Sequence, residues 1–182
     1  MTYKILAAID TSPMSRWVIN AAVSLAKQVH GHIGVLYVLD FDEFEEPPIE
    51  HVSMLEPYPT PPGSPFQCYL GHLNSEHLSA MDNPELHALR TYTHDAIAQG
   101  VSAEFFQCIG EPGPTICEFA KLWEAEMIVL GHRGRSGLVE LLLGSVSNHV
   151  AHYAPRSVHI VRPSLQTNST QPQSIEAVLH SR

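Results

Sequence analysis

The sequence predicts an α/β protein with a five-stranded parallel sheet and helices on both faces of that sheet. The first observation behind this prediction is that strand-length apolar segments alternate along the chain with segments of helical periodicity. The second is that these apolar segments are nearly continuous, as in strands buried on both faces. The third is that two of them end at Asp10 and Gly131, and such sheets bind ligands beyond the carboxyl ends of their strands.

The first forty residues are expected to form a strand, a helix and a second strand. The run from Lys4 to Asp10 is the first strand, and Pro13 is well placed at the first position of the following helix. Gly31 is expected to end that helix. The second strand is expected over residues 33–40.

Residues 41–82 interrupt this alternation and are expected to form an insertion. Seven prolines lie between Pro47 and Pro65, so the stretch is expected neither to pair in a sheet nor to continue a helix. A loop of this length is either functional or disordered. Two interpretations stay open: a mobile surface insertion, or a lid over the ligand site or an arm that binds a partner. Deletion of residues 47–65 is expected to leave the fold intact.

The remaining residues return to the alternating pattern. Asn83 and Pro84 open a helix that Gly100 ends, and the next strand alternates more than the others, as an edge strand does. After Pro163 a polar tail is expected over residues 164–182. The later elements are a strand at 101–108, a helix after the turn at 110–114, a strand at 127–130, a helix at about 145–153 and a strand at 157–161.

Composition excludes several classes of protein. The formal net charge of −9, with ten Lys and Arg residues, argues against general nucleic-acid binding. The apolar runs are far shorter than the roughly 20 residues of a membrane helix, and the chain enters a strand at once, so neither a membrane span nor a signal peptide is expected. Cys68, Cys108 and Cys117 form no CxxC pair, which favours a reduced, cytoplasmic setting with Cys108 and Cys117 as small core residues.

A glycine-rich segment joins the fourth strand to the next helix. Gly131, Gly134 and Gly144 follow the spacing G-x2-G-x9-G, and Ser145 comes directly after. Glycine lets the backbone approach a ligand closely and adopt positive φ, and the first turn of a helix attracts anions. Ser145 is expected to cap the helix and to offer its hydroxyl to a phosphate. The segment therefore predicts a phosphate-binding loop.

With these residues the chain resembles the universal stress protein family, in its ATP-binding subclass. The resemblance covers roughly residues 2–40 and 83–163, and it implies one domain over residues 1–163 that the insertion interrupts. Besides the glycine pattern, the matching residues are Asp10, Ser12, Gly110, Pro112 and the stretches 5–10, 37–40, 145–150 and 154–161.

The resemblance implies strand order 3-2-1-4-5 and ATP or AMP as the ligand, with Mg²⁺ bound through the phosphates. Ala8, Asp10 and the Val38 backbone would lie against the adenine, although Asp10 also suits a capping role in the first helix. Arg133 would balance phosphate charge or simply be solvated. The nucleotide-binding residues implied are Ala8, Asp10, Ser12, Val38, Leu130, Gly131, His132, Arg133, Gly134, Gly144, Ser145 and Val146.

The last strand predicts where a second copy of the chain would pair. As the final strand of an open sheet it leaves one row of backbone groups unpaired, and relatives that the chain resembles dimerise there. The residues expected at this homodimer interface are Val158, His159, Ile160 and Val161. The alternative is that the polar tail covers this edge and leaves a monomer.

Motifs for catalysis or metal binding are not evident. The sequence has no G-x-x-x-x-G-K-[ST] loop, no kinase signature and no G-x-S-x-G elbow. His149 and His152 share a helical face, but two ligands without a nearby Cys or carboxylate predict no metal site. We therefore expect an adenine-nucleotide-binding stress sensor or regulator, with at most slow hydrolysis. The alternatives are a slow ATPase or phosphate-transfer enzyme, and a receptor for another adenine-containing messenger such as a cyclic dinucleotide.

Overall fold

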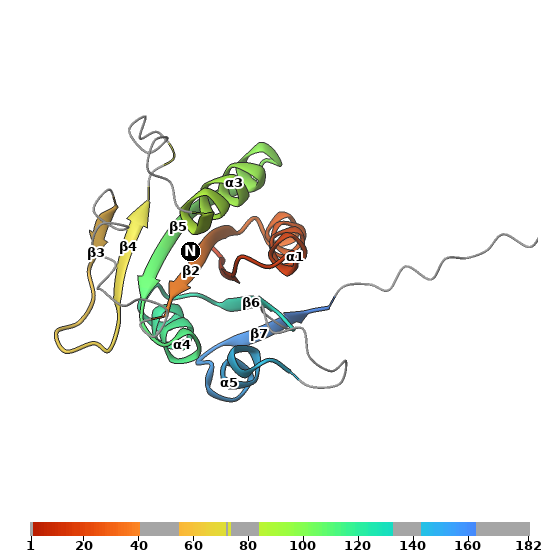
Figure 1. Ribbon diagram of the computed structural model, residues 1–182. Coiled ribbons are helices and arrows are strands. Elements are labelled where there is room, and N and C mark those ends of the chain that lie inside the picture. Colours follow the sequence, from red (N-terminus) through yellow and green to blue (C-terminus); the bar gives the residue numbers. More distant parts are fainter. Residues whose placement is uncertain (1, 41–54, 72, 74–83, 133–142, 163–182) are drawn as a thin grey trace, which may run out of the picture.

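The described part of the chain folds into one mixed sheet with two helices on each face (Figure 1). The computed structural model describes residues 2–40, 55–71, 73, 84–132 and 143–162. Helices α1 (Met14–Val29) and α3 (Pro84–Ala98) cover one face, and α4 (Pro112–Leu122) and α5 (Ser145–Tyr153) cover the other. The strands are β1 (Lys4–Ile9), β2 (His32–Leu39), β3 (Glu56–Tyr58), β4 (Gln67–Gly71), β5 (Ser102–Ile109), β6 (Met127–Gly131) and β7 (Ser157–Val161).

The strands lie in the order β3-β4-β5-β2-β1-β6-β7. The five strands from β5 to β7 pair in parallel, and they are the five expected from the sequence in the order 3-2-1-4-5. The α/β fold class is therefore confirmed. The sheet is larger than expected, because β4 pairs antiparallel with β5 and β3 pairs antiparallel with β4. A purely parallel five-stranded sheet is thus corrected to a mixed sheet in which seven strands are described.

Both additional strands come from the insertion, so the expectation that it cannot pair in a sheet is wrong. β3 is three residues long and lies at the edge of the sheet. Pro57 has no N–H to donate, and an edge strand tolerates this because only one of its sides pairs with a neighbour. The prolines at 59–65 fall in the connection between β3 and β4. Because β4 pairs with it, β5 is an internal strand and not the edge strand that its alternation predicts.

The insertion also contributes to the hydrophobic core. Leu55 is buried on the α1 and α3 side of the sheet, and Phe66 is buried on the α4 and α5 side. The ring of Tyr58 packs edge-on against Phe106 and Phe119, with centroids 5.3 and 5.6 Å apart. These contacts fasten the β3–β4 hairpin to the rest of the sheet, so the insertion is more than surface loop.

Alternate residues of the central strands divide the core into two layers. Ile5, Ala7 and Ile9 of β1 pack towards α1 and α3, whereas Leu6 and Ala8 pack towards α4 and α5. This is the pattern of a strand buried on both faces. None of the helices in the described ranges has the length and apolar content that a bilayer crossing requires.

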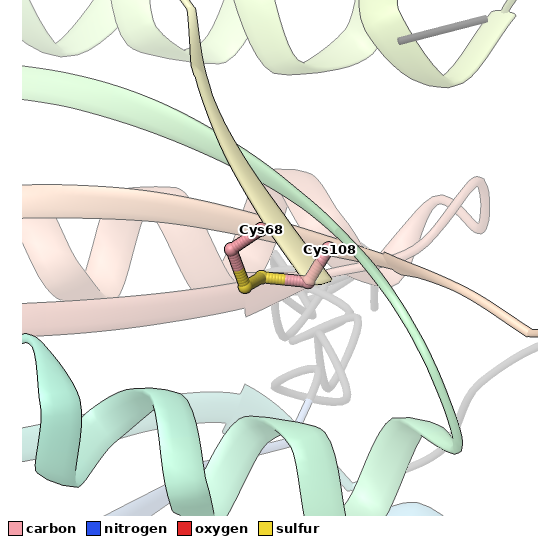
Figure 2. Close-up of a disulfide and its surroundings, with 2 residues drawn as sticks. All are labelled: Cys68 and Cys108. Atoms are coloured by element: carbon pink, nitrogen blue, oxygen red, sulfur yellow. A yellow bond between two sulfur atoms is a disulfide. The ribbon is translucent and has the colours of Figure 1, made fainter. Parts of the chain in front are cut away.

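A disulfide joins Cys68 of β4 to Cys108 of β5 (Figure 2). The two residues are direct neighbours in the antiparallel register, which brings their side chains together. The expectation that Cys108 is a reduced core residue is therefore wrong, because its partner lies on a strand that the sequence did not predict. Cys117 on α4 is a free, buried thiol, and burial raises its pKa.

A polar cluster lies at the amino-terminal edge of the sheet. The carboxylate oxygen Oε1 of Glu104 is 2.9 Å from His32 Nε2 and accepts a hydrogen bond of 3.1 Å from Trp123 Nε1. Ser102 Oγ is 2.8 Å from the other ring nitrogen of His32. The ammonium group of Lys4 donates to the Trp123 carbonyl over 3.0 Å. The cluster connects β1, β2 and β5 to the end of α4.

The cluster makes stability depend on pH. Burial alone would raise the pKa of Glu104, but His32, Trp123 and Lys4 together outweigh it and lower that pKa below its ordinary value of 4.5. Such a group stabilises the fold above its unfolded pKa, and that contribution is lost as the pH falls through the folded pKa.

Glu104→Gln is therefore expected to lower the free energy of unfolding at pH 7, and its deficit against the parent should shrink between about pH 5 and pH 3. Urea unfolding over this pH range measures the deficit, and the exposed Glu118→Gln on α4 is the control. A deficit that is the same at every pH would contradict the assigned role of the carboxylate.

Candidate functional site

A cavity of about 280 Å³ opens at the carboxyl edge of the parallel strands. Its walls are the ends of β1, β2 and β6 and the amino-terminal turns of α1, α4 and α5. β1 lies between β2 and β6. The chain runs from β1 to β2 through α1 on one face of the sheet and reaches β6 from β5 through α4 on the other face, so the cavity lies where the strand order reverses. The sequence-predicted residues that line it are Ala8, Asp10, Val38, Leu130, Gly131, Gly144, Ser145 and Val146.

Asp10 lines the cavity and is held by the start of α1. Its oxygen Oδ1 accepts hydrogen bonds from the Ser12 amide at 2.9 Å and the Ser12 hydroxyl at 2.5 Å. The Ser15 hydroxyl accepts from the Asp10 amide at 3.0 Å, and its single proton lies within hydrogen-bond distance of the Asp10 carbonyl at 2.7 Å and of Oδ1 at 3.1 Å. Asp10 thus organises the turn into α1 while it lines the cavity. The two Ser12 donors at one oxygen fix the orientation of its carboxylate.

The start of α5 forms another part of the cavity wall. The first helical N–H···O bond of α5 runs from the Asn148 amide to the Gly144 carbonyl at 2.8 Å. The amides of Ser145, Val146 and Ser147 therefore precede the helical ladder, at the positive end of the helix dipole. All three residues line the cavity. This end suits an anion.

Two details of this turn differ from expectation. Gly144 has φ −61° and ψ 159°, which any residue adopts, so positive φ is not the reason for glycine there. Ser145 is not the helix cap. Instead the buried Ser147 hydroxyl lies within hydrogen-bond distance of the His132 carbonyl at 2.9 Å and the Gly144 carbonyl at 3.0 Å. Together with the Gly144 amide, which also donates to His132, it ties α5 to the end of β6.

The other predicted residues lie beside the cavity or outside the described residues. Ser12 and His132 are not among the lining residues; Ser12 donates to Asp10, and the buried His132 donates its amide hydrogen to the Val161 carbonyl. Arg133 and Gly134 fall outside the described residues. The lining residues that the sequence analysis did not assign to nucleotide binding are Ile9, Met14, Ser15, Val18, Leu36, Tyr37, Asp40, Pro112, Ile116 and Ser147.

β7 is the last strand of the described sheet. His159 is exposed, Val158 and Ile160 are half-buried against the α4 and α5 layer, and Val161 is buried in the opposite layer. The Val161 carbonyl accepts from the His132 amide beyond β6. Because backbone groups alternate in direction along a strand, the N–H groups of Val158 and Ile160 point away from β6. They are the groups that a second strand would meet.

Among the residues that the structure describes, no three His, Cys, Asp or Glu side chains gather in a group that could hold a metal ion. His152 Nδ1 lies 2.8 Å from the Asn148 carbonyl of its own helix.

Comparison with known proteins identifies the family. Residues 67–162 match the model of the universal stress protein family. Universal stress protein Sll1388 of Synechocystis sp. is 32% identical over 159 residues, which are 87% of this chain and 97% of the relative. Universal stress protein YxiE of Bacillus subtilis is 33% identical over 162 residues, 89% of this chain and 100% of the relative. The chain belongs to the universal stress protein family.

Solved universal stress proteins share the fold at low sequence identity. One in complex with cAMP has a TM-score of 0.60 and 21% identity; the alignment covers 89% of this chain and 98% of that chain. One from Archaeoglobus fulgidus in complex with dAMP has a TM-score of 0.57 and 17% identity, with 89% and 98% covered. One from Arabidopsis thaliana with AMP bound has a TM-score of 0.56 and 16% identity, with 92% and 97% covered.

Proposed function

We propose that this universal stress protein binds an adenine nucleotide, ATP or AMP, in the cavity and acts as a homodimeric sensor or regulator in the stress response. The observation that carries the proposal is that one cavity is lined both by an oriented carboxylate and by the amino terminus of α5. A nucleotide carries a hydrogen-bond-donating amine on its base and negative charge on its phosphates. The cavity therefore offers an acceptor for the amine and N–H donors for the phosphates.

The base would lie between the ends of β1 and β2. Asp10 would accept a hydrogen bond from the exocyclic amine of adenine, and Ala8, Leu36 and Val38 supply apolar surface for the ring. An adenine presents an N–H₂ donor where a guanine presents a carbonyl oxygen. A carboxylate at this position therefore favours adenine over guanine.

The phosphates would lie at the start of α5. The amides of residues 145–147 and the Ser145 hydroxyl are donors at the positive end of the helix dipole, the arrangement that phosphate groups favour. Mg²⁺ would be bound through the phosphates. That solved relatives carry cAMP, dAMP and AMP agrees with an adenine nucleotide in this family.

Two other functions differ in measurable ways. A slow ATPase would release phosphate with Mg²⁺ and lose that turnover in Asp10→Ala. A receptor for a cyclic dinucleotide would prefer that messenger to AMP and ATP in competition. The experiment that tests the proposal is mass spectrometry of the small molecule that co-purifies with the protein, followed by competition among AMP, ATP and a cyclic dinucleotide. We expect AMP or ATP to co-purify; a guanine nucleotide would overturn the proposal.

The homodimer is proposed to form through β7, in a cytoplasmic protein. Pairing two copies of an edge strand about a twofold axis satisfies the outward N–H groups of both. Ile160→Pro removes one outward donor and leaves the hydrogen bonds to β6 in place, because proline is tolerated at an edge position whose N–H faces outwards. Val161→Asp is a poorer test, since Val161 is 8% exposed and belongs to the core.

Sedimentation velocity at tens of micromolar is expected to give a dimer for the parent protein and a monomer for Ile160→Pro. The control is Lys27→Ala, because Lys27 is exposed in the last turn of α1 and lies outside β7. A parent that sediments as a 20.1 kDa monomer would contradict the dimer.

A further inference from the structure

The Cys68–Cys108 disulfide lies at the junction between the β3–β4 hairpin and the parallel sheet (Figure 2). Cys68 is 2% exposed and Cys108 is fully buried. The bond is the covalent connection between β4 and β5, and it closes a loop with a sequence separation of 40. The sulfur atoms do not line the nucleotide cavity, so any influence on the ligand must pass through neighbouring residues.

Two short connections run from this disulfide to the cavity. The first is the sheet itself, because Cys108 is the register partner of Val38, which lines the cavity. The second starts at Phe66, two residues before Cys68. A methyl group built on Gly110 would lie 3.0 Å from Phe66 Cβ, so the hairpin packs directly on the turn between β5 and α4. Two residues beyond Gly110, Pro112 lines the cavity.

The turn at Gly110 is also tied to the opposite wall. The Gly110 amide donates to the Leu39 carbonyl over 2.9 Å, and the next residue, Asp40, lines the cavity beside Val38. The hairpin therefore presses on a turn that holds the end of β2 and the start of α4 together. A change in how firmly the hairpin is held would move both walls.

We propose that Cys68 and Cys108 are a redox-controlled clamp on the nucleotide cavity. In the disulfide form the hairpin is fastened to β5 and keeps the 110–112 turn in its binding position. In the dithiol form the hairpin loosens, the turn loses its support from Phe66, and the nucleotide binds more weakly. This inference rests on the proposed function for its readout, but the loosening of the turn can be measured without any ligand.

The chemical step is a thiol–disulfide exchange with a dithiol reductant. One thiolate of the reductant attacks the sulfur of Cys68 or Cys108 and forms a mixed disulfide, which releases the other cysteine. The second thiol of the reductant then attacks the reductant's own sulfur in the mixed disulfide and releases the remaining cysteine. Two electrons and two protons pass to the protein, which gains two thiols, and the reductant becomes a disulfide. Because both sulfur atoms are buried, the attack requires local opening of the hairpin, whose outer strand β3 is only three residues long. Disulfides of cytosolic proteins are usually of this transient, redox-sensing kind.

The test compares the intact parent protein in its oxidised form and after full reduction by dithiothreitol. Alkylation and mass spectrometry count the thiols, and two additional thiols are expected on reduction, beside Cys117. Calorimetry is expected to show AMP affinity about tenfold weaker in the reduced protein, within the usual range of coupling between sites. The melting temperature should fall by about 5–10 °C. Hydrogen exchange should become faster at the Gly110 amide and in β4.

The controls separate the clamp from the proposed function. Cys68→Ser with Cys108→Ser should bind like the reduced parent and ignore dithiothreitol, whereas Cys117→Ala should respond as the parent does. Equal AMP affinity in the two redox forms, or unchanged exchange at Gly110 after complete reduction, would overturn the clamp. Failure of both forms to bind AMP, together with faster exchange at Gly110 on reduction, would overturn the proposed function and leave the clamp standing.

Discussion

Gly144→Val is expected to weaken AMP and ATP binding by about a hundredfold or more while the fold stays intact. Gly144 lines the cavity at the start of α5, where a branched side chain would occupy space that the phosphates need. Its φ and ψ of −61° and 159° lie in the extended region that valine favours, so the substitution imposes little backbone strain. The loss in affinity would therefore come from the cavity and not from unfolding.

Calorimetric titration with AMP measures this effect, and thermal melting confirms that the variant is folded. Ala151→Val is the matched control, because Ala151 is exposed on the same helix and lies away from the cavity. Gly144→Ala, with one added methyl, should fall between the parent and the valine variant. If Gly144→Val binds AMP as tightly as the parent, the phosphate end of the site is assigned wrongly.

Removing the core contacts of the hairpin is expected to cause the largest loss of stability. In Leu55→Ala with Tyr58→Ala, the buried Leu55 side chain and the ring contacts of Tyr58 with Phe106 and Phe119 disappear. Burial of two such side chains contributes about 3–5 kcal/mol. A typical domain has only about 5–15 kcal/mol in total. Deletion of residues 47–65 removes the same two side chains, so in place of the intact fold expected from the sequence we expect a loss of stability at least as large.

Urea unfolding of the double variant against Pro61→Ala with Pro62→Ala makes the comparison. Both prolines are exposed in the connection between β3 and β4, so their replacement should change the free energy of unfolding by less than about 0.5 kcal/mol. If the double variant of Leu55 and Tyr58 is as stable as this control, the insertion has no structural role in the core.

The parallel strands β1, β2 and β6 could be predicted because each is a nearly continuous apolar run whose burial on both faces needs no knowledge of its neighbours. The hairpin could not, since both of its strands are short, β3 contains Pro57, and further prolines separate β3 from β4. The disulfide depends on the register between β4 and β5, which no spacing of cysteines reveals. The local sequence pattern thus predicts the central strands, whereas the hairpin and the disulfide depend on tertiary pairing.

The residues of the candidate site also divide into those that the sequence predicts and those that depend on the fold. Asp10 and Gly131 could be predicted because they follow apolar strands directly, where parallel sheets expose their carboxyl ends. Ser15 and Ile116 could not, because which helix turn faces the cavity depends on the order of the strands. Glycine at 144 is expected from the sequence both for close approach to a ligand and for its conformation; because its backbone is extended, only the argument from space applies there.

The central claim is that the cavity at the carboxyl ends of β1, β2 and β6 binds an adenine nucleotide. Calorimetric titration of the purified protein with AMP, and in parallel with GMP, tests it most directly. We predict saturable AMP binding with a Kd in the micromolar range and GMP binding at least about tenfold weaker, because the Asp10 carboxylate can accept from the amine of adenine but faces the carbonyl of guanine. Absence of saturable binding of AMP and ATP up to millimolar concentration, or equal affinity for GMP, would contradict the account.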